Sequence, residues 1–173
     1  MNIINNHWKS LFLFCLGLTV GTAFCMKWLE TEFLLNDGKF TMIGLEISYS
    51  KEKVAAIMAA IDDHSRSALK YQLYFDFAFM AGVYPSIAAL CMMARQKIVS
   101  PSFRKIIFAI ALMQTFAWIA DIIENLFLLK WLSPPVEVSD FGLYHFIVYA
   151  KWLIALTGFF IAVLVLVFNR KIK

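Results

Sequence analysis

Charged residues are scarce in this chain. Only 16% of its 173 residues are Asp, Glu, Lys or Arg, whereas soluble domains carry about a quarter. Hydrophobic residues make up 61%, and the mean hydropathy is +0.72. A soluble core cannot cover this much apolar surface, so the composition indicates a membrane protein. Nucleic-acid binding is not indicated despite the net charge of +4, because the basic residues gather at the ends of apolar runs.

Cysteine and histidine are also scarce and lack the spacings that bind metals. The three cysteines include no C-x-x-C pair, which argues against a disulfide framework and favours small, buried apolar residues. The three histidines form no H-x-x-x-H or H-E-x-x-H pattern, so neither a histidine zinc site nor a bis-histidine haem is indicated. No G-x-S-x-G motif, phosphate-binding loop or dinucleotide fingerprint is present, and the sequence names no cofactor.

Long apolar runs are the feature that the chain has in abundance. Four runs approach the roughly 20 residues that cross a bilayer, at about 10–29, 69–94, 106–129 and 143–168. The first is expected to be an uncleaved span, because it is as long as a full span and no A-x-A site precedes a polar region. The predicted fold is all-α, a membrane-spanning four-helix bundle that forms a single integral membrane domain over residues 1–173.

The distribution of Lys and Arg predicts the orientation of these spans. Basic residues gather between the second and third spans and in the C-terminal tail: Arg95, Lys97, Arg104, Lys105, Arg170, Lys171 and Lys173. The connection before the fourth span carries Glu137 and Asp140, but no Lys or Arg after Lys130. The positive-inside rule then predicts a multi-pass protein of the cell inner (plasma) membrane with both termini in the cytoplasm.

The outer loop between the first two spans, at about 30–68, is long enough to have structure of its own. Ser50 is a typical N-cap and is followed by apolar residues at helical spacing, which predicts an amphipathic helix over about 51–61. This helix is expected either to rest on the outer membrane surface or to cap the mouth of the bundle. Residues 40–49 partly alternate between apolar and polar types, which predicts a short extended segment.

Small residues four positions apart predict close packing of the spans. Gly17-x-x-x-Gly21 in the first span and Ala78-x-x-x-Gly82 in the second are patterns that let helix backbones approach each other. They support a bundle, and do not by themselves specify a dimer.

Ionisable side chains inside the spans are the main functional signal. Asp76 lies in the second span, Asp121 and Glu124 in the third, and Lys151 in the fourth, while Lys27 ends the first. At 1.5 Å per residue, the first four lie roughly 8–12 Å in from the outer boundary. A charge at such a depth costs several kcal/mol unless it faces a partner, water or a ligand. We therefore expect these side chains to converge in one pocket that is shielded from lipid.

Helical spacing adds further residues to this pocket. Offsets of 3, 4 and 7 place the polar residues of the third span on one face. The candidate ligand-binding residues are Asp76, Tyr84, Gln114, Asp121, Glu124, Asn125 and Lys151. Ala155 and Gly158, the small residues below Lys151 on the same helix face, are expected to leave room for its side chain or for a ligand. A mixed nitrogen and oxygen metal set is a further option, with candidates Asp76, Asp121, Glu124 and His145.

The charges of the candidate pocket do not balance. Three carboxylates and one lysine leave two excess negative charges if all are ionised, and a buried excess of this kind needs compensation. The carboxyl groups can hold protons, a metal or another cation can bind, or Lys27 or Lys130 can reach in. These three remedies imply different functions, and the sequence leaves all three open.

The order of these features resembles a group of uncharacterised bacterial four-span membrane proteins. The matching residues are Tyr74-Phe75-Asp76 and Tyr84 in the second span, Ala120 to Leu126 (ADIIENL) in the third, and Lys151-Trp152 in the fourth. The amphipathic stretch before the second span is also similar. The resemblance implies that Asp76, Asp121, Glu124, Asn125 and Lys151 act together, and it assigns no reaction.

Three functions are compatible with the sequence. The favoured one is binding or transport of a small ligand, an ion or a lipid headgroup in the buried polar site. The second is a structural or accessory subunit of a membrane complex, in which buried ion pairs fix helix register and an oligomer or a partner subunit docks. The third and least favoured is an intramembrane enzyme that modifies lipid, with a carboxylate as general base or a metal-activated water.

Overall fold

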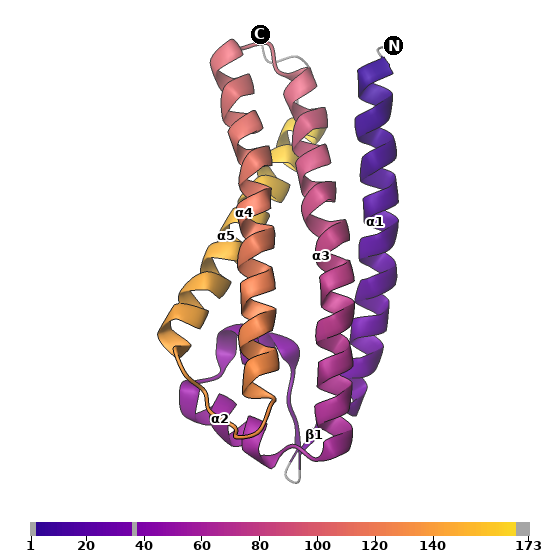
Figure 1. Ribbon diagram of the computed structural model, residues 1–173. Helices are drawn as coiled ribbons and strands as arrows, with labels where there is room; N and C mark the ends of the chain where they lie inside the picture. Colours follow the sequence, from indigo (N-terminus) through magenta and orange to yellow (C-terminus); the bar gives the residue numbers. More distant parts are fainter. Residues whose placement is uncertain (1–2, 36–37, 169–173) are drawn as a thin grey trace.

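The computed structural model describes residues 3–35 and 38–168. Its long helices are α1 (Ile3–Leu29), α3 (Asp63–Lys97), α4 (Pro101–Trp131) and α5 (Phe141–Phe168) (Figure 1). Each is part of a helical segment that is long and apolar enough to cross a membrane. The structure thus confirms the predicted all-α four-helix fold and fits a polytopic membrane protein. The basic residues of the tail, Arg170, Lys171 and Lys173, lie outside the described residues, and the direction in which the termini face stays a prediction.

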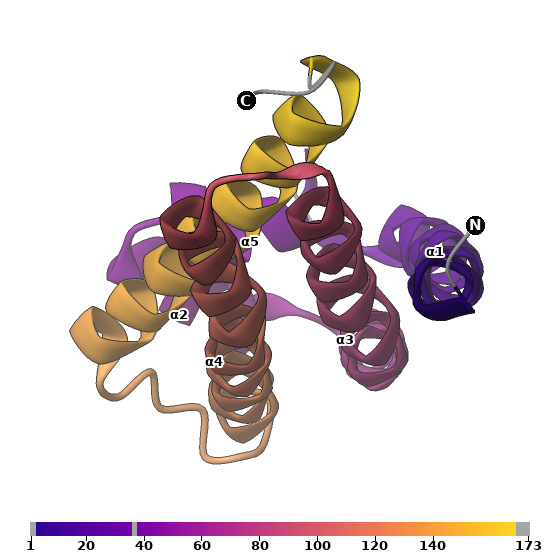
Figure 2. The same cartoon turned by 90° about the horizontal axis from the view of Figure 1, so that it is seen from above.

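Helix α3 is the centre of the bundle. It packs along α1 on one side and along α4 and α5 on the other, and α4 also packs along α5 (Figures 1 and 2). Among the long helices, α1 packs extensively on α3 alone. One end of the bundle carries both termini, and we call it the tail end. The other end carries the connection between α1 and α3, which we call the roof.

Glycine packing confirms one of the two small-residue patterns. A Cβ atom added at Gly82 of α3 would lie 2.7 Å from Thr19 Oγ1 and 2.9 Å from the carbonyl oxygen of Cys15 on α1. Because side chains do not approach backbone this closely, only glycine allows the observed contact. The other pattern was wrong as a packing signal within the described chain, since Gly17 and Gly21 have nothing within 4 Å of such a Cβ.

The roof contains several short elements. They are the 3₁₀ turn η1 (Glu30–Glu32), strands β1 (Leu34–Leu35) and β2 (Gly38–Lys39), the π-helical turn η2 (Gly44–Ser48) and helix α2 (Lys51–Ala60). Helix α2 confirms the predicted amphipathic helix, and the Ser50 side chain accepts a hydrogen bond from the Lys53 N–H at 3.3 Å. Its buried face shares a core with Leu69, Trp131 and Tyr144 of the long helices, so α2 caps the bundle.

The predicted extended segment over residues 40–49 was wrong. The chain forms the helical turn η2 there, with a hydrogen bond of 2.8 Å from the Tyr49 N–H to the Gly44 carbonyl. Gly44 makes this turn possible because the Tyr49 ring occupies the space that a Cβ atom would need. The turn buries the next residues, Leu45 and Glu46, against the bundle.

Candidate functional site

Lys151 of α5 lies at the centre of a buried cluster of charges. Its Nζ is 2.6 Å from Asp121 Oδ1 and 2.6 Å from Glu124 Oε2, both on α4. It is also 3.5 Å from Glu46 Oε2 of the roof. All four side chains are buried, so these contacts are shielded from lipid. The lysine and the carboxylates of the third span meet as the depth argument expects.

Glu46 is the member of the cluster that the sequence analysis missed. Besides Lys151, it contacts Trp152, whose Nε1–H donates to Glu46 Oε2 at 3.1 Å. The signal available in the sequence was an isolated acid between the apolar residues Leu45 and Ile47. Alternation of this kind predicts an extended segment, and only the turn η2 brings Glu46 to within 3.5 Å of Lys151 Nζ.

Two further hydrogen bonds extend the cluster to α3. The Tyr84 hydroxyl donates to Asp121 Oδ2 at 2.8 Å. The Asn125 Nδ2 group donates to Asp76 Oδ2 at 2.8 Å and to the Leu73 carbonyl at 3.4 Å. Asp76 is only 7% exposed, yet no cation of the described chain lies within 4.0 Å of it. Asp76 is therefore a buried carboxyl held by an amide alone.

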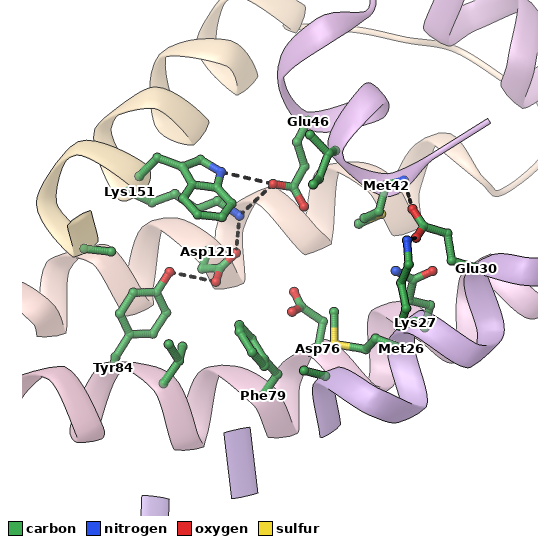
Figure 3. A pocket seen from close by; sticks show the side chains of 16 residues that line it. Met26, Lys27, Glu30, Met42, Glu46, Asp76, Phe79, Tyr84, Asp121 and Lys151 are labelled. Atoms are coloured by element: carbon green, nitrogen blue, oxygen red, sulfur yellow. Dashed lines mark hydrogen bonds and ion pairs between the residues drawn. The ribbon is translucent and has the colours of Figure 1, made fainter. Parts of the chain in front are cut away.

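A cavity of about 290 Å³ lies beside this cluster. Helices α1, α3, α4 and α5 and the roof all line it, and the close-up in Figure 3 shows Asp76, Tyr84, Asp121, Lys151 and Glu46 around it. Gln72 also lines it, is 3% exposed, and has an Oε1 atom without a hydrogen-bond partner among the described residues. Two acceptors on neighbouring turns of α3, Gln72 and Asp76, thus belong to one cavity wall.

Three of the predicted site residues do not line the cavity. Glu124 and Asn125 are fully buried behind its wall, where they hold Lys151 and Asp76. Gln114 lies farther toward the tail end, against Gly158, and donates to the Ile110 and Ile154 carbonyls at 3.3 Å. Its side chain therefore fills the room predicted at Gly158, whereas Ala155 does line the cavity.

The candidate metal set does not assemble. The His145 ring packs among aromatic rings, 4.4 Å from the Phe141 centroid, and makes no hydrogen bond or ion pair to a carboxylate of the described residues. Within residues 3–35 and 38–168, no group of three or more His, Cys, Asp and Glu side chains could hold a metal ion. The metal candidates Asp76, Asp121, Glu124 and His145 therefore receive no geometric support.

The cluster carries a larger charge imbalance than the sequence suggested. With Glu46, the cluster contains one lysine and four carboxyl groups, those of Glu46, Asp76, Asp121 and Glu124. If all of them are ionised, three negative charges are in excess. Neither Lys27 nor Lys130 compensates for this negative charge, because Lys27 pairs with Glu30 and Lys130 contacts Ser139 Oγ at 3.2 Å. Two remedies are left, namely protons on the carboxyl groups or a bound cation.

The pH dependence of stability should report on Glu46, which belongs to the roof and lies outside the helical spans. Burial raises the pKa of Glu46 from its ordinary value of 4.5, and the nearby Lys151 opposes this rise. The folded state then holds the proton more tightly than the unfolded chain, so the contribution of Glu46 is full below pH 4.5 and is lost as the pH rises through the raised pKa.

We expect Glu46→Gln to flatten the fall of the melting temperature as the pH rises above about 4.5, since one such group contributes at most about 1.4 kcal/mol per pH unit. Lys151, Asp121, Glu124 and Asp76 are unchanged in this variant. The control is Glu52→Gln on α2, whose exposed carboxyl has a pKa lowered by backbone and Ser50 hydrogen bonds and stays ionised over this range. Identical pH profiles for wild type and Glu46→Gln would contradict the prediction.

Comparison of the chain with protein-family models, with curated proteins and with solved structures gives no match.

Proposed function

We propose that this protein binds a small, positively charged ligand in the cavity, with Asp76 as the main contact. The observation that carries this proposal is the unequal pairing of the charges. The Lys151 ammonium already faces three carboxylates, so it serves as an internal counter-ion and is not free to hold an anion. Asp76 has no cation partner in the described chain and lines the cavity, so a cation from outside would complete the pairing.

Gln72 supports the same class of ligand. Its Oε1 atom is buried without a hydrogen-bond partner among the described residues, and leaving such an acceptor unpaired costs about 1–3 kcal/mol. An ammonium group carries several N–H donors, so one ligand can serve both Gln72 and Asp76. Phe79 and Val83 of the same helix line the cavity below and suit an apolar substituent on the ligand.

The core at the tail end supports binding over transport. Beyond the cavity, α3, α4 and α5 meet through a cluster of apolar side chains that includes Ile87, Leu90, Cys91, Ile107 and Ala162. A transported cation would have to cross this layer without polar partners, at high energetic cost. The Lys and Arg bias of the sequence further suggests that the roof faces outward, so the cavity would be at the depth of the outer leaflet of the plasma membrane.

A second candidate function is a structural or accessory subunit. The open space beside Gly17 and Gly21 on α1 favours it, because this face would let a partner helix approach closely. The enzyme alternative has less support: carboxylates line the cavity, but no Ser, Thr or Cys nucleophile and no His of the described residues does.

A binding measurement with hexylammonium chloride tests the proposal. Hexylammonium should raise the melting temperature of the detergent-solubilised protein saturably, whereas hexanol, which lacks the charge, should not. Asp76→Asn keeps the size of the side chain and should weaken hexylammonium binding at least about tenfold. The control is Asp63→Asn, an exposed acid in the first turn of α3. Equal binding by Asp76→Asn and wild type would refute Asp76 as the cation contact.

A further inference from the structure

We infer that the ligand is an amine-headed phospholipid that reaches the cavity sideways from the bilayer, between α1 and α5. This inference rests on the proposed function and specifies the chemical class of its ligand. It follows from which segments border the cavity on each side and which charges lie around it.

A segment of the roof covers part of the cavity on the side that faces water, and Ile43 of this segment is 61% exposed. On the α1 side, the Met42 N–H donates to Glu30 Oε1 at 2.9 Å. On the α5 side, Glu46 accepts from Trp152 Nε1 at 3.1 Å, and the Tyr144 hydroxyl donates to the Leu45 carbonyl at 3.3 Å. The segment from Met42 to Glu46 is thus anchored at both ends above the cavity (Figure 3), which disfavours direct access for a solute from the water.

On the side between α1 and α5, partly exposed side chains line the cavity. These two helices flank α3 and do not pack extensively on each other (Figure 2). Ala23 and Met26 on α1 and Trp152 and Ala155 on α5 line the cavity from its two edges, and Trp152 is 36% exposed. Ala23 lies six residues before the end of α1 at Leu29, or roughly 9 Å along the helix. The opening that we infer on this side therefore faces the acyl region of a bilayer.

The charges around the cavity match a phosphoethanolamine headgroup. Its ammonium group would bind Asp76 and Gln72, as in the proposed function. Its phosphodiester needs a cation, and Lys27 on α1 lines the same cavity with a side chain that is 80% exposed. Lys27 is paired with Glu30 in this structure, so the phosphate would share or replace that contact. At about 290 Å³ the cavity suits a headgroup, and the acyl chains would extend through the opening into the bilayer.

Short-chain lipids in maltoside micelles test the inference. Wild-type protein should bind dioctanoyl phosphatidylethanolamine at least about tenfold more tightly than dioctanoyl phosphatidylglycerol, which lacks the amine. It should also bind this lipid at least about tenfold more tightly than O-phosphoethanolamine, which has the same headgroup without chains. Comparable affinity for either of these two probes would overturn the inference.

A variant at the opening separates the lipid from the headgroup site. Ala23→Trp should narrow the opening and weaken phosphatidylethanolamine binding at least about tenfold, because its chains must pass between α1 and α5. Ala23 also lines the cavity, so hexylammonium binding should weaken as well, but by a smaller factor than lipid binding, because hexylammonium has no acyl chains to pass between the helices. A cooperative thermal melt in micelles shows that the variant is folded. Ala109→Trp, at an exposed position of α4, is the matched control.

The two proposals fail in different ways. If wild type binds hexylammonium but not phosphatidylethanolamine, or if Ala23→Trp binds the lipid as wild type does, lateral lipid binding is refuted and the cation site stands. If wild type binds neither hexylammonium nor the lipid, both proposals are refuted.

Discussion

Lys151→Met is expected to lower the free energy of unfolding by about 3–5 kcal/mol, the usual loss when one partner of a buried ion pair is removed. The Lys151 ammonium faces Asp121, Glu124 and Glu46, and the change leaves all three carboxyl groups buried without a cation. A buried carboxyl escapes this penalty only while it holds a proton. Burial raises the pKa of Glu46, and Lys151→Met removes the cation that opposes this rise, so the loss should be larger at about pH 8 than at about pH 5, in thermal or denaturant unfolding in micelles.

Two further variants show whether this loss of stability comes from the missing positive charge or from the replacement of a lysine side chain as such. Lys27→Met removes a lysine from the same cavity, but the Lys27 side chain is 80% exposed, so its pair with Glu30 should contribute no more than about 1 kcal/mol. Adding Asp121→Asn and Glu124→Gln to Lys151→Met removes the unpaired charges and should recover most of the stability. A Lys151→Met protein as stable as Lys27→Met at both pH values would show that the cluster is not a buried ionic network.

The residues of the candidate site that could be predicted from the sequence are those whose positions depend on helix geometry alone. A rise of 1.5 Å per residue and a known span length place Asp76, Asp121, Glu124 and Lys151 at one depth. The high cost of unpaired charge in lipid then requires them to turn inward. The structure agrees for Lys151 with Asp121 and Glu124, and for Asp76 with Asn125. The amphipathic helix over residues 51–61 was also predictable, since both its N-cap and its period are local, but its position as a cap over the bundle was left open.

The features that the sequence did not predict depend on contacts between distant segments. Glu46 reaches the cluster because of the turn η2. In that turn the Tyr49 ring packs where a Cβ atom of residue 44 would lie, which only a glycine allows. The Gln114 side chain does not line the cavity because it packs between α4 and α5 against Gly158, which lies 44 positions away along the chain. Neither contact has a period or spacing that could be recognised in a single sequence.

Gly82 is the second position at which we expect a large effect, because it sets the distance between α1 and α3. A methyl group there would lie 2.8 Å from the Thr19 nitrogen and 2.9 Å from the Cys15 oxygen. Both atoms belong to the α1 backbone, so the helix must move as a body. We expect Gly82→Ala to cost about 1–3 kcal/mol, the usual range for overpacking, and Gly82→Leu to cost more, measured as the free energy of unfolding in micelles.

The displacement of α1 should also impair binding, since Ala23, Met26 and Lys27 form one edge of the cavity. Gly82→Leu should therefore weaken hexylammonium binding at least about tenfold, even at temperatures where the variant is folded. Gly21→Ala is the matched control, because a Cβ atom there meets nothing within 4 Å and both stability and binding should stay close to wild type. If Gly82→Leu binds hexylammonium normally, α1 is not a wall of the site, and the cation must be held by α3, α4 and α5 alone.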